Sequence, residues 1–136
     1  MKIPKSLLVT GINAYSDQGA LRKQKFHTDG KKFLKELAAM LGVSDKCDIR
    51  SNVAGMAVSG EVTLHADHIY VQLSESSKPG ISILYRSCEH RKDYCGGPNN
   101  FATMQDLAGD DDAQNAFVAR CKRLMAAAEA AATATA

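Results

Sequence analysis

The chain has no tryptophan, only three prolines and few aromatic residues, which make up 6% of its 136 residues. It also lacks an excess of either charge, since its net charge is +2. This balance argues against a general nucleic-acid coat protein, in which lysine and arginine dominate. No apolar run approaches the roughly 18 residues that a membrane span requires. The N-terminal apolar stretch is too short for a signal peptide, so we expect a cytoplasmic protein with no membrane partner.

Signatures of phosphate binding and of catalysis are missing as well. Neither Gly-x-x-x-x-Gly-Lys-Ser/Thr nor the dinucleotide pattern Gly-x-Gly-x-x-Gly occurs in the sequence. The Gly-x-Ser-x-Gly turn that exposes a catalytic serine is absent too. No acid–base pair stands at a characteristic spacing. We therefore favour a protein that is not an enzyme, with no catalytic residue and no cofactor.

The length and the apolar fraction of 45% predict one domain, residues 1–136, with its own core. Residues 1–27 are poorly defined, with a pattern that allows a short helix over 18–25. Residues 127–136 form a tail rich in alanine and threonine, which we expect to fray. In a reducing compartment the cysteines are expected to be free thiols. These cysteines are Cys47, Cys88, Cys95 and Cys121.

Two stretches show the spacing of amphipathic helices. One begins at Thr28 or Asp29, either of which can cap it, and ends at Gly42. The other begins at residues 110–112, three aspartates that suit the positive end of a helix dipole. Each helix has one apolar face to bury.

Four segments between these helices show the alternation of half-buried strands. Their short connections favour an antiparallel meander. We therefore predict an α+β fold, a four-stranded antiparallel sheet packed against two helices in the order helix, four strands, helix. The strand segments are 48–53, 58–65, 68–73 and 81–86.

The stretch that follows the last predicted strand is the densest in groups that bind ligands. Arginine offers a planar fork of donors that fits phosphate oxygens, and a Gly-Gly pair lets successive N–H groups converge on an anion. Tyrosine can stack on a base, and asparagine can bond to a base edge or a ribose hydroxyl. We predict a site for a phosphate-bearing ligand here. Its candidate residues are Tyr85, Arg86, His90, Arg91, Lys92, Asp93, Tyr94, Gly96, Gly97, Asn99 and Asn100.

The same stretch has other interpretations. Glycine, proline and asparagine also form plain surface turns, for backbone reasons alone. Cys88, His90 and Cys95 are residue types that bind zinc, although the run between the cysteines is longer than in structural zinc knuckles. A cysteine nucleophile with a histidine base is a further alternative.

A second basic region runs through the N-terminal part of the chain. It is either a solvated helix face or a second contact surface for phosphates. Its members are Arg22, Lys23, Lys25, His27, Lys31, Lys32 and Lys35.

Three segments, 58–65, 69–74 and 85–101, together resemble a group of small proteins from bacteriophages and prophages. The most specific part runs from Arg91 to Asn99, with the order Arg-Lys-Asp-Tyr-x-Gly-Gly-x-Asn. The resemblance covers about residues 26–108. It implies a phage or prophage origin, in a bacterial host cell, and no mechanism. Small phage proteins often bind a host molecule and keep it from its target, so a phage origin favours such sequestration over metabolism.

We therefore predict a non-enzymatic phage-type protein that captures a phosphate-bearing small molecule, such as a signalling nucleotide, in counter-defence or regulation. A homo-oligomer is expected, because single small domains seldom enclose a ligand. The alternatives are a single-stranded nucleic-acid-binding protein and an inhibitor that binds a host protein.

Overall fold

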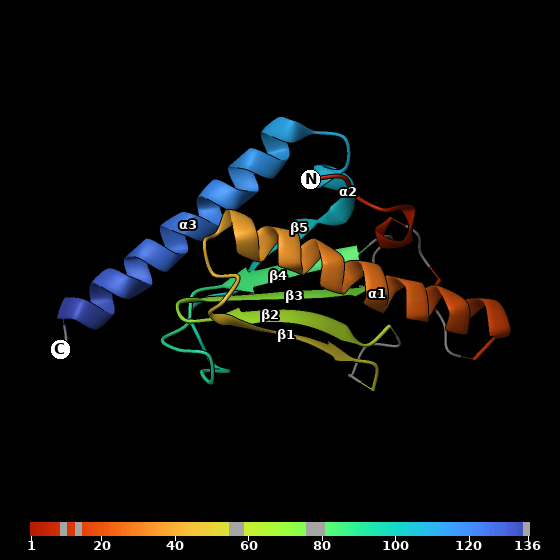
Figure 1. The fold of residues 1–136 in the computed structure, drawn as a ribbon, viewed down its shortest axis with the longest axis horizontal. Helices are drawn as coiled ribbons and strands as arrows, with labels where there is room; N and C mark the ends of the chain where they lie inside the picture. The colour runs from red at the N-terminus through yellow and green to blue at the C-terminus, as the bar shows by residue number, and fades with distance from the viewer. Residues whose placement is uncertain (9–10, 13–14, 55–58, 76–80, 135–136) are drawn as a thin grey trace.

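A computed structural model describes residues 1–8, 11–12, 15–54, 59–75 and 81–134 of the chain. It confirms an α+β fold built on an antiparallel sheet (Figure 1). The strands lie side by side in chain order, and each pairs only with its sequence neighbours. They are β1 (Cys47–Asn52), β2 (Glu61–Ala66), β3 (Ile69–Glu75), β4 (Ile81–Arg86) and β5 (Asn100–Thr103).

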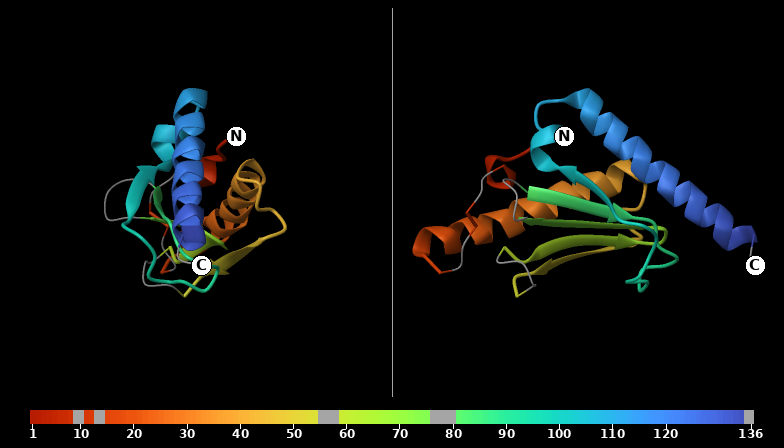
Figure 2. Two further views of the ribbon diagram at one scale, coloured as in Figure 1. Left: turned by 90° about the vertical axis from the view of Figure 1, so that its left-hand side faces the viewer. Right: turned by 180° about the vertical axis from the view of Figure 1, so that it is seen from behind.

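Two long helices cover one face of this sheet. Helix α1 (Asp17–Met40) packs on β1 and β2, and α3 (Asp111–Ala134) contacts β3 and β4. A 3-10 turn, η1 (Lys5–Leu7), lies against α1, and the short α2 (Met104–Leu107) connects β5 to α3. Figures 1 and 2 show that the C-terminal end of α3 projects beyond the sheet.

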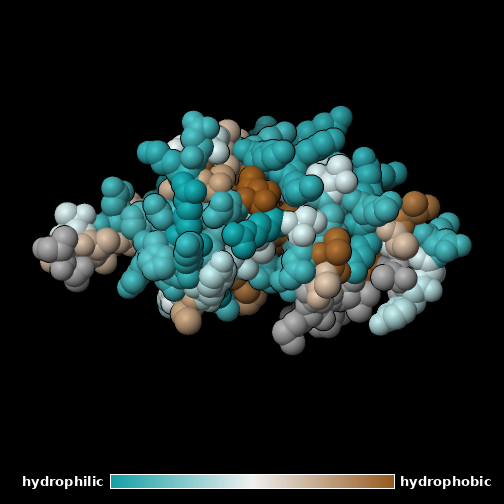
Figure 3. Space-filling view, turned by 60° about the horizontal axis from the view of Figure 1, so that its bottom comes forward, coloured by the Kyte–Doolittle hydropathy of each residue, from teal (hydrophilic) through white to brown (hydrophobic). Residues whose placement is uncertain are grey.

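Strand alternation separates a covered face of the sheet from an open one. Along β3, the side chains of Ile69, Val71 and Leu73 are fully buried, whereas Tyr70 and Gln72 between them are only partly buried. Paired residues of antiparallel strands point to the same side of the sheet. The residues of β2 and β4 that pair with Ile69, Val71 and Leu73 therefore lie on the covered face, and those that pair with Tyr70 and Gln72 lie on the open face. The open face is largely hydrophilic, with separate apolar patches (Figure 3).

The first helix begins earlier than the sequence pattern predicted. It begins after Ser16, whose side chain accepts a hydrogen bond from the N–H of Gly19, and not at Thr28 or Asp29. The hydroxyl of Thr28 donates back to the carbonyl of Gln24, as it does inside a helix. The basic segment that precedes Thr28 is therefore part of the same helix. The side chain of Phe26, which is fully buried, gives this earlier part of the helix an apolar contact with the core.

The predicted number of strands and helices was also wrong. A fifth strand, β5, and the helix α2 lie between the last predicted strand and the second predicted helix. Strand β5 has four residues, and its Phe101 is 67% exposed, so alternation gives no signal there. The hydroxyl of Thr103 accepts from the N–H of Asp106 and caps α2.

Other boundaries agree more closely. Strand β4 covers residues 81–86 as predicted, and Asp110 caps α3 by accepting from the N–H of Ala113 at 2.9 Å. Helix α3 continues through Ala134, further than the predicted fraying allowed. Residue 58 of the second predicted strand and residues 135–136 of the tail lie outside the described residues. None of the described helices combines the length and the apolar character that crossing a bilayer needs.

Candidate functional site

The loop of residues 87–99, which joins β4 to β5, is attached to the neighbouring β2–β3 hairpin. The N–H of Arg91 donates to Oδ1 of Asp67 at 3.1 Å, and the thiol of Cys88 donates to the carbonyl of Ala66 at 3.3 Å. Both acceptors lie where β2 turns into β3. The predicted site loop is therefore bound to the end of the sheet and does not extend freely into solvent.

Asp93 organises this loop from within. Its carboxylate accepts the N–H groups of Glu89 at 2.9 Å and of Cys95 and Gly96 at 3.1 Å each. The hydrogen bonds from Glu89, Gly96 and Cys95 stabilise the charged form and hold the pKa of Asp93 at about 2. The converging N–H groups that we expected to bind a phosphate thus already bind a carboxylate of the chain itself.

The two glycines of the loop allow close packing. Gly96 has a φ of +53°, and a Cβ there would lie 2.6 Å from the carbonyl oxygen of Ser87. A Cβ on Gly97 would crowd the hydroxyl of Ser87, and the N–H of Gly97 donates to the carbonyl of Ser87 at 2.8 Å. Gly96 therefore requires glycine, whereas a side chain at Gly97 would require the Ser87 side chain to rotate.

Arg86 connects the sheet to the loop. Its guanidinium donates to the carbonyl of Tyr94 at 2.8 Å and to Oδ1 of Asn99 at 3.2 Å. Its Cζ also lies 4.6 Å from the centre of the Tyr70 ring, a cation–π contact. Arg86 therefore holds the loop in place, and part of its donor capacity is already in use.

Four side chains on the open face form what we call the open-face cluster, namely His65, Tyr70, Arg86 and Tyr94. The first three come from adjacent strands, because His65 pairs with Tyr70 and Tyr70 pairs with Arg86. The His65 ring meets those of Tyr70 and Tyr94 edge-on, with centroids 5.1 and 5.2 Å apart. Tyr94 remains 60% exposed, whereas His65 is 5% exposed.

Unsatisfied polar atoms gather in and beside this cluster. Within the described residues, three buried side-chain atoms have no hydrogen-bond partner: Nε2 of His65, Nδ1 of His68 and Nε of Arg86. His68 ends the β2–β3 turn with a φ of +75°, which is uncommon for a residue with a side chain. Buried polar atoms are nearly always paired, so their concentration at one place requires an explanation.

Burial sets the charge state of His65. Desolvation lowers its pKa, against the opposing effect of hydrogen bonds with the backbone of His90 and Asp93. His65 is therefore neutral at neutral pH, and its unpaired Nε2 can accept or donate one hydrogen bond.

Arg91 and Lys92 lie apart from Arg86. The charge of Arg91 acts on the thiol of Cys47, where it opposes the rise in pKa that burial causes, so the guanidinium lies near the start of β1. Three strand spacings separate β1 from β4, or about 14 Å. No side-chain hydrogen bond or ion pair engages Arg91 or Lys92 within the described residues. The cations therefore flank the open-face cluster and do not converge on one point.

The remaining predicted residues fall into two groups. Tyr85 lies on the covered face, 4% exposed, where its hydroxyl accepts from Nε of Arg120 at 3.0 Å, so it is separated from the others by the sheet. His90 lies in the loop, whereas Asn100 is the first residue of β5 and pairs with Tyr85. Nδ1 of His90 accepts from the N–H of Lys92, and the amide of Asn100 donates to the carbonyls of Pro98 and Tyr85.

A cavity of about 620 Å³ separates the loop from the end of α3. Its charged lining residues are Glu89 and Asp93, and α3 contributes Ala128, Ala131 and Ala132. Because its ionisable groups are acidic, this cavity is a poor site for an anion.

The four cysteines are free thiols. Burial raises the pKa of Cys88 to about 11 and that of Cys121 to about 12, so neither is a thiolate nucleophile at neutral pH. Nowhere in the described ranges do three His, Cys, Asp or Glu side chains group closely enough to hold a metal ion. The zinc alternative of Cys88, His90 and Cys95 therefore lacks the required geometry.

Part of the open face was not predicted from the sequence. His65 and Tyr70 belong to the open-face cluster but were not among the predicted ligand residues, and Phe101 lies on the same face because it pairs with Leu84 of β4. The signal for Tyr70 was available, since it alternates with the apolar residues Ile69 and Val71. Phe101 had no such signal, because β5 was not predicted.

Comparison with protein-family models, with curated proteins and with solved structures gives no match to this chain. The site is therefore defined by its geometry alone.

Proposed function

We propose that the protein is a non-enzymatic binding protein that holds a phosphate-bearing nucleotide against the open face of its sheet, next to the 87–99 loop. The observation that carries this proposal is the concentration of unpaired buried polar atoms on His65, His68 and Arg86. A ligand that displaces the protein atoms now covering these buried groups would supply the missing partners and offset the cost of about 1–3 kcal/mol that each unpaired atom carries.

The surrounding side chains fit the parts of a nucleotide. The exposed ring of Tyr94 offers a surface on which a base can stack. Arg91 and Lys92 have free side-chain charges at one end of the cluster, where phosphates can bind without competing for an existing ion pair. Asn99 adds an amide group at the other end, next to Arg86.

The spacing of the cations favours an extended ligand. Arg86 lies at the end of β4, whereas the backbone of Arg91 is bound to Asp67 in the β2–β3 turn and its charge acts on Cys47 at the start of β1. A single inorganic phosphate would reach only one of them. A nucleotide with several phosphates, or two linked nucleotides, would span the row and contact both ends.

Capture without turnover is the role that we propose for this site. The buried thiols are protonated, and the described residues contain no grouped metal ligands. The phage-type origin, the regulatory or counter-defence role and the assembly into a homo-oligomer belong to the same proposal.

Calorimetry against cyclic, linear and linked nucleotides tests the proposal. We expect the variant Arg91→Gln/Lys92→Gln to bind about tenfold more weakly or worse, since charged hydrogen bonds are lost. The variant Lys31→Gln/Lys122→Gln removes the same charge elsewhere and should bind like the parent chain. The proposal is wrong if the folded protein binds no nucleotide tighter than about 100 µM.

Single-stranded nucleic acid is a second candidate, and the exposed aromatic rings favour it. Tyr94 and Phe101 are 60% and 67% exposed, and both belong to the open face. Stacking on such rings contributes about 1–3 kcal/mol per base. An oligonucleotide that binds far tighter than any mononucleotide, with an affinity that falls steeply with salt, would select this function.

A further inference from the structure

Strand β1 forms one of the two edges of the sheet. It pairs with β2 on its inner side, and within the described residues no backbone group bonds to its outer side. Figure 1 shows β1 as the outermost strand, below α1. An edge strand carries unpaired N–H and C=O groups, to which a further strand can bind. The backbone of β1 can therefore accept one more strand.

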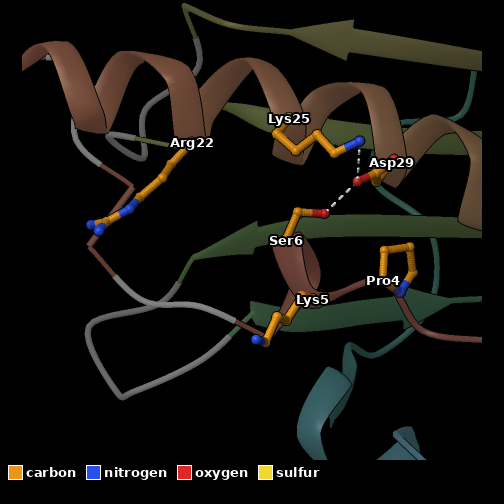
Figure 4. Close-up of a pocket in the computed structure, with 6 residues that line it drawn as sticks. All are labelled: Pro4, Lys5, Ser6, Arg22, Lys25 and Asp29. Atoms are coloured by element: carbon orange, nitrogen blue, oxygen red, sulfur yellow. Dashed lines mark hydrogen bonds and ion pairs between the residues drawn. The ribbon is translucent and has the colours of Figure 1, made fainter.

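A groove accompanies this edge on the helix-covered side of the sheet. One flank of α1 is covered by η1, where Ser6 and Lys25 bind the carboxylate of Asp29 (Figure 4). Ala38 lies nine residues after Asp29, half a turn around the helix, and lines a groove of about 420 Å³ between the other flank of α1 and β1. The edge thus combines free backbone groups with a surface that is open to a partner. The groove residues are Lys35, Ala38, Ser44, Cys47 and Ile49.

Strand β1 carries one charge of each sign on the open face. Asp48 and Arg50 both pair with open-face residues of β2, and the partner of Asp48 is His65. Ile49 between them points to the covered side, because it pairs with the fully buried Leu64. In the part of the chain that the structure describes, neither Asp48 nor Arg50 forms a hydrogen bond or an ion pair. Both charges are therefore available to a partner.

The order of these side chains is complementary to itself. A two-fold axis perpendicular to the sheet pairs the edge with a second copy in antiparallel order, with one residue on the axis. Two such registers keep five of the six strand residues paired, namely those centred on Ile49 and on Arg50. The register centred on Arg50 places two arginines opposite each other. The register centred on Ile49 places each Asp48 opposite Arg50 of the second copy, so the charges favour this register.

We propose that two copies of the chain associate through β1, in the register centred on Ile49, and form one continuous sheet. Two Asp48–Arg50 ion pairs flank the axis on the open face, and the two Ile49 side chains meet on the covered face beside the grooves. Both open-face clusters then lie on the same side of the joined sheet. This interface specifies the homo-oligomer of the proposed function. Its test uses no ligand, so its failure and the failure of nucleotide capture are measured separately.

Charge reversal tests the interface, with sedimentation velocity and native mass spectrometry as the measurements. Asp48→Lys and Arg50→Glu should each weaken the dimer about tenfold or more, because two attractive pairs become repulsive. The double variant Asp48→Lys/Arg50→Glu again places opposite charges across the interface and should dimerise like the parent chain. Circular dichroism on each variant verifies the fold.

Mixing the two single variants gives the sharpest measurement. One variant is positive at both positions and the other is negative at both, so an equimolar mixture should form the heterodimer in preference to either homodimer. As controls, Glu129→Lys and Lys122→Glu reverse exposed charges of α3 and should dimerise like the parent chain, with no preference on mixing.

Three results would overturn the proposal. A parent chain that is monomeric at about 100 µM would mean that the charges of β1 protect the edge from association. Single variants that dimerise as tightly as the parent chain would place the interface elsewhere. A mixture of Asp48→Lys and Arg50→Glu that forms no heterodimer would rule out the register centred on Ile49.

Discussion

Asp93 shows how one side chain can determine the use of a loop. Its carboxylate occupies the N–H groups of Glu89, Cys95 and Gly96, which a loop of this composition would otherwise offer to a ligand. Among the described loop residues, the side chains of Arg91 and Lys92 then remain the charged groups that can contact a phosphate. The composition of the loop indicated an anion site, and the anion found there belongs to the protein.

The variant Asp93→Ala should loosen this loop. We expect amide hydrogen exchange at Glu89, Cys95 and Gly96 to become faster, because these N–H groups lose their acceptor. The control Asp112→Ala removes an exposed carboxylate from the first turn of α3 and should leave these three amides unchanged. Unchanged exchange in the Asp93 variant would show that the carboxylate does not organise the loop.

Two buried histidines should make stability depend on pH. Burial is the largest cause that lowers the pKa of both His27 and His65 below 6.5. Between the lowered folded value and 6.5, the unfolded chain binds more protons, so the free energy of unfolding falls as pH decreases through this range. We expect urea denaturation to give a lower stability at pH 5.5 than at pH 7.5.

The variant His27→Gln/His65→Gln should reduce this pH dependence, measured as the difference in stability between the two pH values. His90→Gln changes an exposed histidine of the loop and should keep the full difference. If the parent chain, the double variant and the His90→Gln variant all show the same difference in stability between the two pH values, then groups other than His27 and His65 cause the pH dependence.

At the scale of the elements, helix α1 is one continuous unit that starts at Ser16. The variant Ser16→Ala should destabilise the protein by about 1 kcal/mol, because the N–H of Gly19 loses its cap. Thr28→Ala, at the position where the sequence pattern placed the cap, should have almost no effect. The two variants are compared by thermal denaturation. A larger effect at Thr28 would contradict the continuous helix.

The contact between α1 and β2 depends on a glycine. A Cβ on Gly30 would lie 3.1 Å from Cγ2 of Val62, which is fully buried on the covered face. We expect Gly30→Ala to cost about 1–2 kcal/mol, because the crowding of Val62 exceeds the gain in helix propensity. In a Val62→Ala background, the same change should stabilise by up to about 1 kcal/mol. Equal effects in both backgrounds, measured by urea denaturation, would contradict this packing.

Sequence patterns predicted some elements better than others, for physical reasons. Strand β4 was predicted correctly, because Ile81, Ile83 and Tyr85 alternate with less buried residues and a turn precedes them. Strand β5 lacks such alternation. It is stabilised by pairing with β4, which a local sequence pattern does not reveal. The start of α1 was missed because Gly30 and Thr28 are poor helix formers, and the packing against Val62 overrides their propensity.

At the scale of the whole molecule, the two faces of the sheet have different tasks. The helices bury the covered face, and the open face carries the open-face cluster, with Arg91 and Lys92 to one side of it. The loop composition predicted a ligand site in this region, and that site is our proposal. Its geometry could not be predicted, because the pairing of Arg86 with Tyr70 and the attachment of Arg91 to Asp67 depend on strand register.

The most direct test of the central claim is an NMR titration of the full chain with the tightest-binding nucleotide from the calorimetry panel. The account predicts that the largest amide shifts fall at residues 65–72 and 86–101, which include the open-face cluster and the loop. Shifts confined to the outer surfaces of α1 and α3, or no shifts at saturating ligand, would contradict it.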